Sequence, residues 1–162
     1  MYGERCTVYK GFFMIRISRF IASVFGIGYL PFLPGTLGSV VGLLGYVLYF
    51  HTRGTALLFW LFGLGVVGVV ASQKALKGQR QIDPSWIVID ETLGMLVSYY
   101  LVPVRWPFLL LGFCLFRFFD ITKLFPINRL EHLPGAWGIL LDDVGAGVYT
   151  NLVLQIFLRA TS

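Results

Sequence analysis

The stretch 138–148, G-I-L-L-D-D-V-G-A-G-V, sets two adjacent aspartates into an otherwise apolar run. Two more apolar stretches carry acids in the same way: I-V-I-D-E-T-L-G-M-L-V at 87–97 and L-F-R-F-F-D-I-T-K at 115–123. A carboxylate inside a membrane costs several kcal/mol, about 2.5–3.5 on insertion scales, so it usually marks an ion, proton or substrate site. Together these stretches hold five of the eight carboxylates of the chain, namely Asp90, Glu91, Asp120, Asp142 and Asp143. The pattern indicates apolar helices that share a metal-binding site.

Composition places the chain among membrane proteins. Of its 162 residues, 57% are hydrophobic and 13% charged, about half the usual soluble share. A soluble chain of this length has too little interior to hide so much apolar surface. The net charge is +5, and the basic residues lie mostly in the gaps between apolar runs, as in loops that face anionic lipid. No nucleic-acid-binding module is visible.

We predict an all-α, polytopic membrane domain of four to five apolar helices, with residues 1–162 as one domain. The apolar segments lie near 37–51, 55–72, 86–103, 106–120 and 139–158. Residues 26–158 would form the catalytic core. Residues 1–25 would form an interfacial amphipathic helix, since Arg16 and Arg19 interrupt an apolar pattern near helical spacing. Glycines within the spans, such as Gly38 and Gly42, are typical of close helix packing.

The distribution of basic residues predicts the orientation. Lysines and arginines gather before the first segment, after the second and after the fourth, whereas the opposite connections hold only Arg53 and Arg105. The positive-inside rule then puts the N-terminus and both long loops in the cytoplasm. All three acid-bearing stretches reach the membrane from that same side, so their carboxylates are expected at one depth, facing the cytoplasm.

Carboxylate oxygens from three helices suit a hard cation, and Mg²⁺ also keeps positions for water and phosphate. The expected metal ligands are Asp90, Glu91, Asp120, Asp142 and Asp143. His51 lies on the far side by this topology and His132 is isolated, so zinc is disfavoured.

Basic and hydroxyl groups beside the acids predict phosphate binding. Arg117, Asp120 and Lys123 recur every third residue and share a helix face, although Arg117 also fits a purely charge-neutralising role. P-G-T-L-G-S at 34–39 opens the first segment from the same side, where a helix N-terminus offers N–H groups to an anion beside Thr36 and Ser39. Hydroxyls at these positions also serve as helix caps. The combination predicts phosphoryl chemistry on a lipid head group, by attack of water or through an acyl-phosphate.

The four blocks P-G-T-L-G-S, I-V-I-D-E-T-L-G-M, R-F-F-D-I-T-K-L-F-P-I and G-I-L-L-D-D-V-G-A-G, in this order, strongly resemble the phosphatidylglycerophosphatase A family. The resemblance implies a multi-pass enzyme of the bacterial cytoplasmic membrane, dependent on Mg²⁺, that hydrolyses phosphatidylglycerophosphate to phosphatidylglycerol and phosphate. Its partner would be an anionic phospholipid, with no obligate protein partner evident. The chain departs from the family pattern at Leu124, where proline usually follows the lysine, and at Ala136, where a glycine pair is usual.

The resemblance carries over the positions of the functional residues, whereas their division into roles is our own assignment. We expect Asp120, Asp143 and Glu91 to be catalytic, and the substrate phosphate to be bound by Thr36, Ser39, Arg117 and Lys123.

Two other classes of function stay open. A small ion or proton transporter would use the carboxylates as a relay, but a relay needs acids at several depths. Other lipid phosphoryl-transfer enzymes would need motifs such as D-G-x-x-A-R or S-G-H, which the chain lacks. A purely structural membrane protein would gain nothing from costly buried acids.

Overall fold

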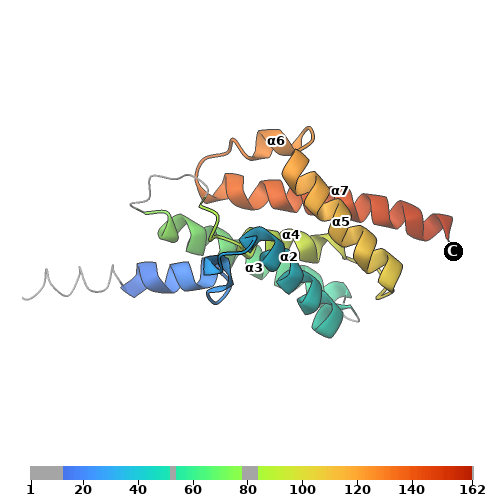
Figure 1. The fold of residues 1–162 in the computed structure, drawn as a ribbon, viewed down its shortest axis with the longest axis horizontal. Coiled ribbons are helices and arrows are strands. Elements are labelled where there is room, and N and C mark those ends of the chain that lie inside the picture. Colours follow the sequence, from blue (N-terminus) through green and yellow to red (C-terminus); the bar gives the residue numbers. More distant parts are fainter. Residues whose placement is uncertain (1–12, 52–53, 78–83, 162) are drawn as a thin grey trace, which may run out of the picture.

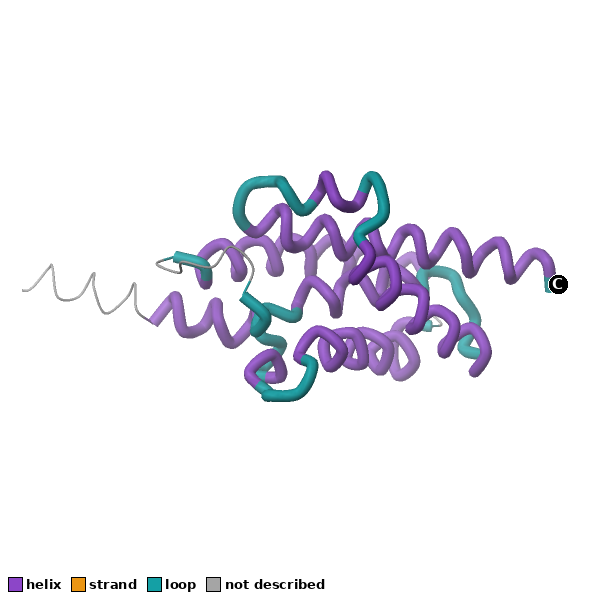
Figure 2. The backbone as a smooth tube through the Cα atoms, turned by 45° about the horizontal axis from the view of Figure 1, so that its top comes forward, coloured by secondary structure: helices purple, strands orange, loops and turns teal. Residues whose placement is uncertain are grey.

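The computed structural model describes residues 13–51, 54–77 and 84–161. Within these ranges the chain is all-helical and contains no strand, as predicted (Figure 2). The helices are residues 13–22, α2 (Pro34–Gly45), α3 (Gly54–Ala75), α4 (Ile89–Ser98), α5 (Trp106–Thr122), α6 (Ile127–Leu130) and α7 (Ala136–Ala160). A 3-10 turn, η1 (Ile27–Tyr29), precedes α2, and a π turn, η2 (Tyr46–Phe50), continues it.

Local chemistry explains several helix ends. Proline occupies the first turns of α2 and α5, where its missing N–H costs no hydrogen bond. Helix α5 stops at Lys123, whose φ of 43° is left-handed. Helix α7 begins after Gly135, at φ 64°, and the Gln73 side chain from α3 accepts the Ala136 N–H at 3.0 Å. A side chain distant in sequence thus caps the helix that carries two of the acids.

Helix α4 lies at the centre of the bundle and packs against α2, α3, α5 and α7 (Figure 1). Eight of its ten residues are buried. At 1.5 Å per residue it is about 15 Å long, roughly half of the hydrocarbon thickness of a bilayer. The predicted span 86–103 is therefore wrong in length, because extended loops occupy both of its ends and protein, not lipid, surrounds the helix.

Close glycine crossings hold α4 in place. A Cβ at Gly42 would lie 2.6 Å from the Thr92 carbonyl oxygen, and one at Gly94 would lie 2.5 Å from the Asp143 carbonyl oxygen. A Cβ at Gly147 would collide with the Gly94 carbonyl. The Thr92 hydroxyl also donates to the Gly38 carbonyl at 3.0 Å. Backbones in such contact fix the level at which α4 and α7 present their side chains.

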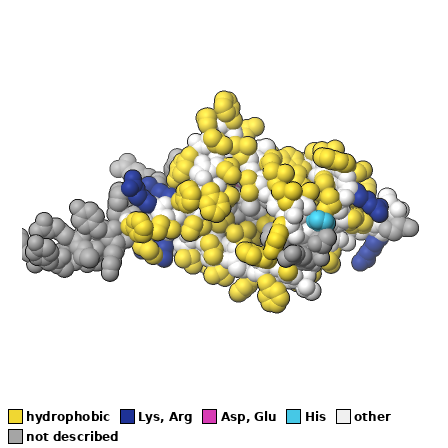
Figure 3. All heavy atoms as spheres, turned by 90° about the horizontal axis from the view of Figure 1, so that it is seen from below, with side chains coloured by type: hydrophobic (Ala, Val, Ile, Leu, Met, Phe, Trp, Pro, Cys, Tyr) yellow, Lys and Arg dark blue, Asp and Glu magenta, His cyan; other side chains and the backbone are white. Residues whose placement is uncertain are grey.

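Two helices of the described residues, α3 and α7, are long and apolar enough to cross a membrane, fewer than the four to five predicted. Helix α3 carries a largely exposed apolar surface that includes Phe59, Trp60 and Phe62. One whole face of the molecule is dominated by hydrophobic side chains, with lysines and arginines toward its two ends (Figure 3). This distribution is typical of a protein whose flanks contact lipid.

Residues 13–22 of the predicted interfacial segment form a helix that rests on the bundle. Phe13, Ile17 and Phe20 are exposed, while Ser18 and Ala22 are buried against the bundle. The Val88 N–H donates to the Ala22 carbonyl at 3.0 Å, which ties this helix to the loop before α4. The rest of the predicted interfacial segment, residues 1–12, lies outside the described residues.

Candidate functional site

A cavity of about 340 Å³ opens where the starts of α2 and α4, the end of α5 and the early turns of α7 meet. Its lining residues are Leu33, Pro34, Gly35, Thr36, Ser85, Ile87, Asp90, Glu91, Arg117, Asp120, Lys123, Ile139, Asp142 and Asp143. Eight of the nine residues expected in the site therefore line a single cavity. The ninth, Ser39, is fully buried next to it and lies 3.5 Å from Arg117 Nη1.

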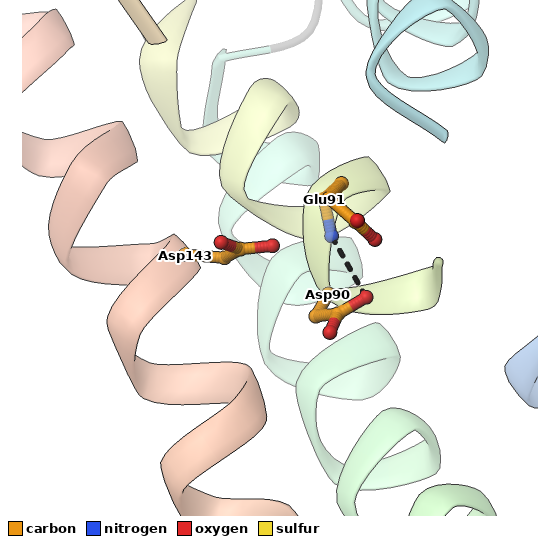
Figure 4. A group of neighbouring side chains, drawn as sticks. All are labelled: Asp90, Glu91 and Asp143. Atoms are coloured by element: carbon orange, nitrogen blue, oxygen red, sulfur yellow. Dashed lines mark hydrogen bonds between the residues drawn. The ribbon is translucent and has the colours of Figure 1, made fainter. Parts of the chain in front are cut away.

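Three carboxylates form the interior of this cavity. Asp90, Glu91 and Asp143 each offer an oxygen, and these oxygens lie within 4.8 Å of one another (Figure 4). Asp143 reaches from α7 toward the start of α4, where Asp90 and Glu91 lie in the first turn. Asp90 and Asp143 are each only 5% exposed. Three like charges so close in a poorly solvated place repel strongly, so the cluster requires positive charge nearby.

The two acid pairs have the same local geometry. Asp90 Oδ1 accepts the Glu91 N–H at 3.1 Å, and Asp142 Oδ1 accepts the Asp143 N–H at 2.9 Å. In each pair the first carboxylate folds back on the backbone of the second residue. Both residues of each pair line the cavity.

Two ion pairs occupy the wall of the cavity formed by α5 and the segment after it. Arg117 Nη1 lies 2.7 Å from Asp120 Oδ2, and Lys123 Nζ lies 2.7 Å from Asp142 Oδ2. Lys123 also approaches Glu131 Oε1 at 3.2 Å. Burial alone would lower the pKa of Lys123, but its hydrogen bonds and charge contacts with Asp142 and Glu131 outweigh burial and raise this pKa above its usual range. Lys123 thus stays charged at the rim of the carboxylate cluster.

The first turn of α2 faces the same carboxylates. A Cβ at Gly35 would lie 2.5 Å from Glu91 Oε1 and 3.3 Å from Arg117 Nη1, so a side chain here would displace the ends of these two residues. The first N–H groups of a helix have no partner inside it and carry partial positive charge. The Ser39 hydroxyl turns away from the cavity mouth and donates to the Gly35 carbonyl at 2.9 Å. Thr36 therefore lines the cavity, whereas Ser39 supports its wall.

Sequence reasoning missed several residues of the site. Ser85, Ile87 and Ile139 line the cavity, and Glu131 holds Lys123 from outside it. Ile87 and Ile139 sit inside the quoted motifs but carry no chemical signal beyond hydrophobicity. Ser85 and Glu131 lie in loops, and only tertiary structure brings them here. Neither of the two departures from the family pattern, Leu124 and Ala136, lines the cavity.

The carboxylate cluster fits a hard cation. Glu91 Oε2 is buried and has no hydrogen-bond partner among the described residues, although a buried carboxylate oxygen normally has one. Mg²⁺ and Ca²⁺ bind oxygens at about 2.0–2.6 Å, so oxygens within 4.8 Å of one another can reach one ion with little movement. Asp120 and Asp142, in contrast, already bind Arg117 and Lys123, so the predicted five ligands divide into three that face one another and two that are paired with cations.

A helical protein with a long apolar flank, and with acids and bases around one cavity, has the features expected of a membrane-associated phosphoryl-transfer protein. Residues 20–158 match the family described as Phosphatidylglycerophosphatase A. The chain belongs to this family, which confirms the resemblance of the sequence motifs, and it is a phosphatase.

Curated relatives agree with the family assignment. A phosphatidylglycerophosphatase A of Haemophilus influenzae is 34% identical over 137 residues, 83% of this chain and 84% of the relative. The protein of that name from Escherichia coli is 31% identical over 137 residues, which are 83% of this chain and 79% of the relative. A Bacteroides thetaiotaomicron protein, provisionally named a phosphatidylinositol-3-phosphatase, is 36% identical over 144 residues, which are 84% of this chain and 90% of the relative. No solved structure matches the chain.

Proposed function

We propose that this protein hydrolyses the terminal phosphomonoester of phosphatidylglycerophosphate and releases phosphatidylglycerol and inorganic phosphate. The observation that carries the proposal is one cavity in which three clustered carboxylates, two of them on buried residues, meet two cationic side chains and a helix N-terminus. Family membership and the names of two relatives supply the substrate.

Arg117 and Lys123 are the groups proposed to bind the substrate phosphate. A phosphomonoester carries about −1.5 to −2 charges at pH 7, with oxygens that accept strong hydrogen bonds from guanidinium and ammonium groups. In its absence the two cations neutralise Asp120 and Asp142 at 2.7 Å. The first turn of α2, with Thr36, would receive a further phosphate oxygen.

We propose Mg²⁺ as the cofactor, held by Asp90, Glu91 and Asp143. Support comes from the proximity of their oxygens and from the buried Oε2 of Glu91, which lacks a protein partner among the described residues. When bound, the ion would polarise the phosphoryl group and lower the pKa of a coordinated water. Glu91 and Asp143 therefore act in catalysis by holding positive charge next to the phosphate.

Asp120 is the proposed general base. Its side chain is 15% exposed, more open than the 7% of Asp142, and Arg117 orients it. The Asp120 carboxylate would take a proton from water as the water oxygen bonds to phosphorus. The bond from phosphorus to the glycerol oxygen breaks, and the leaving oxygen would receive the proton that Asp120 took from the water. A direct attack by Asp120 would give an acyl-phosphate instead. Hydrolysis in ¹⁸O-labelled water and trapping of the intermediate distinguish this route from direct attack by water.

The proposed location is the bacterial cytoplasmic membrane, crossed by α3 and α7, with the cavity toward the cytoplasm. Lys74 ends α3, and Lys123 and Arg129 lie near the start of α7, on the side predicted to be cytoplasmic. Among the described residues, every acid except Glu131 lines the one cavity, and Glu131 contacts Lys123. A proton relay would need acids at several depths, so this gathering favours the phosphatase over a transporter.

The test is phosphate release from phosphatidylglycerophosphate by purified protein, with Mg²⁺ or with chelator. Asp120→Asn and Asp143→Asn are the informative variants, because each keeps the size of the side chain and removes its charge. We expect Mg²⁺-dependent release by the wild type and a loss of at least a hundredfold in both variants. Phosphatidylinositol 3-phosphate serves as the competing substrate. Faster release from that lipid, or none from phosphatidylglycerophosphate by folded protein, would refute the proposed substrate.

A further inference from the structure

An apolar groove of about 450 Å³ runs between α2 and α5. All nine residues along it are apolar, namely Val40, Leu43, Leu44, Val47, Val104, Trp106, Leu109, Leu110 and Phe113. Several of them are open to the surroundings: Leu44 is 50% exposed, Leu110 62% and Trp106 76%. The groove is thus open on the flank of the bundle, and no side chain of the described residues fills it.

The groove continues the catalytic cavity along the same two helices. On α2, Thr36 lines the cavity and Val40, one turn later, lines the groove. On α5, Arg117 lines the cavity and Phe113, one turn earlier, lines the groove. Residues four apart lie on the same helix face, so both walls pass from polar to apolar at the same level. The contact of Arg117 Nη1 with Ser39 Oγ, at 3.5 Å, marks the boundary.

We propose that this groove binds one acyl chain of the phospholipid whose phosphate enters the catalytic cavity. The inference rests on the proposed function and adds a chain-binding subsite to it. A phospholipid joins an anionic head group to hydrocarbon chains. The protein has a matching arrangement, in which the charged cavity is followed, one helical turn along α2 and α5, by the apolar groove. A soluble phosphomonoester would make no use of the groove.

The length of the groove agrees with this occupant. From Thr36 to Val47 the helix rises about 16 Å at 1.5 Å per residue. Half of a bilayer's hydrocarbon core is about 15 Å thick. A lipid of the leaflet that the cavity faces therefore has a chain that reaches from the cavity to Val47.

A second apolar groove, lined in part by Phe62, Val66, Leu93, Trp137 and Leu140, lies between α3, α4 and α7. Its residues on α7 alternate with those of the cavity, because Ile139, Asp142 and Asp143 face the site whereas Leu140, Leu141 and Val144 face the groove. This groove lies on the other side of α7 from the phosphate-binding pair. We assign the acyl chain to the α2–α5 groove, and the second groove becomes a competing outcome of the test.

The first experiment compares long-chain and six-carbon-chain phosphatidylglycerophosphate as substrates. Val40→Trp puts a large side chain where the groove leaves the cavity. Leu48→Trp, on the continuation of the same helix, is the matched control, since Leu48 is 78% exposed and outside the groove. We expect the ratio of kcat/KM for long over short chains to fall at least tenfold in Val40→Trp and to stay unchanged in Leu48→Trp. An unchanged ratio in an active Val40→Trp protein overturns the proposal.

A labelling experiment gives a second readout that does not depend on turnover. The wild-type protein in vesicles is irradiated with phosphatidylglycerophosphate that carries a diazirine in one acyl chain, and separately with phosphatidylcholine that carries the same chain. We expect peptides from α2 and α5 to be labelled more strongly with the phosphomonoester lipid. Equal labelling with both lipids, head-group-dependent labelling of the second groove, or a crosslinked second copy of the chain in the α2–α5 groove overturns the proposal.

The two experiments separate this inference from the proposed function. If phosphatidylglycerophosphatase activity is absent, the wild type releases no phosphate from either chain length. If only the chain subsite is wrong, the wild type releases phosphate from both substrates, and the labelling of the α2–α5 groove does not depend on the head group.

Discussion

The crossing of α4 and α7 at Gly94 offers the sharpest test of the site geometry. In Gly94→Ala the new Cβ would lie 2.5 Å from the Asp143 carbonyl oxygen and 2.7 Å from Phe116 Cε2. The closer neighbour is backbone, which cannot rotate away as a side chain can. Ordinary contact begins at 3.4 Å, so α4 and α7 must separate by about 0.9 Å.

This separation acts directly on the carboxylate cluster, because Asp143 belongs to α7 whereas Asp90 and Glu91 belong to α4. A misplacement of about 1 Å in an active site costs on the order of 100-fold in rate. Overpacking of this size also destabilises a protein by about 1–3 kcal/mol. We therefore expect Gly94→Ala to fold, with a lower melting temperature, and to lose about 100-fold in phosphate release.

The assay is phosphate release from phosphatidylglycerophosphate at saturating Mg²⁺, with thermal unfolding of the same preparation in detergent. Gly63→Ala is the control, since a Cβ at Gly63 meets no atom within 4 Å and the site is remote. The control is expected to keep wild-type activity. Wild-type activity in folded Gly94→Ala would show that catalysis does not need the spacing of Asp143 from Asp90 and Glu91.

Three further predictions concern single side chains. Glu91→Gln removes a charge from the proposed cation site and should raise the half-activating Mg²⁺ concentration by about tenfold or more. A Mg²⁺ titration of both phosphate release and melting temperature checks this. Equal titration curves for the variant and the wild type would contradict the assignment of Glu91 to the cation site. Lys123→Met removes the cation that pairs with Asp142, whose side chain is 7% exposed. The change should cost about 1–3 kcal/mol of stability, because a buried charge loses its partner. Chemical unfolding should show that adding Asp142→Asn recovers part of this loss, and no recovery would argue against the Lys123–Asp142 ion pair. Because the folded-state pKa of Lys123 is raised, its contribution is complete below the unfolded pKa of about 10.4 and disappears as pH rises through the higher folded value. The stability difference between wild type and Lys123→Met should therefore stay constant from pH 7 to 9 and shrink only in strong alkali, and a difference already lost by pH 9 would mean that the ion pair is not its cause.

The residues that decide membership of the family were visible in the chain itself. Four short motifs in fixed order predicted the phosphatidylglycerophosphatase A family, and the match over residues 20–158 confirms it. The all-helical class also followed from the long apolar runs. Both properties depend on residue identity and local periodicity, which a sequence states directly.

The number of membrane-length helices did not follow from the sequence. The segment around α4 contains enough apolar residues to be taken for a span, yet eight of the ten residues of α4 are buried among other helices. Hydropathy reports only that a segment avoids water, and it cannot distinguish a lipid neighbour from a protein neighbour. Packing through Gly42, Gly94 and Gly147 makes that choice, because close backbone contact on two sides encloses α4 in protein.

The sequence by itself determined which residue types are available to the site and that they approach it from one end of the bundle. Only the tertiary structure decided how they divide: Asp90, Glu91 and Asp143 face one another, whereas Asp120 and Asp142 are paired with cations. The spacing of acids along a chain cannot specify this division, because it depends on distances between different helices. Those distances are set where glycine backbones touch, and by the turn at Lys123 that brings its ammonium group to Asp142 on α7.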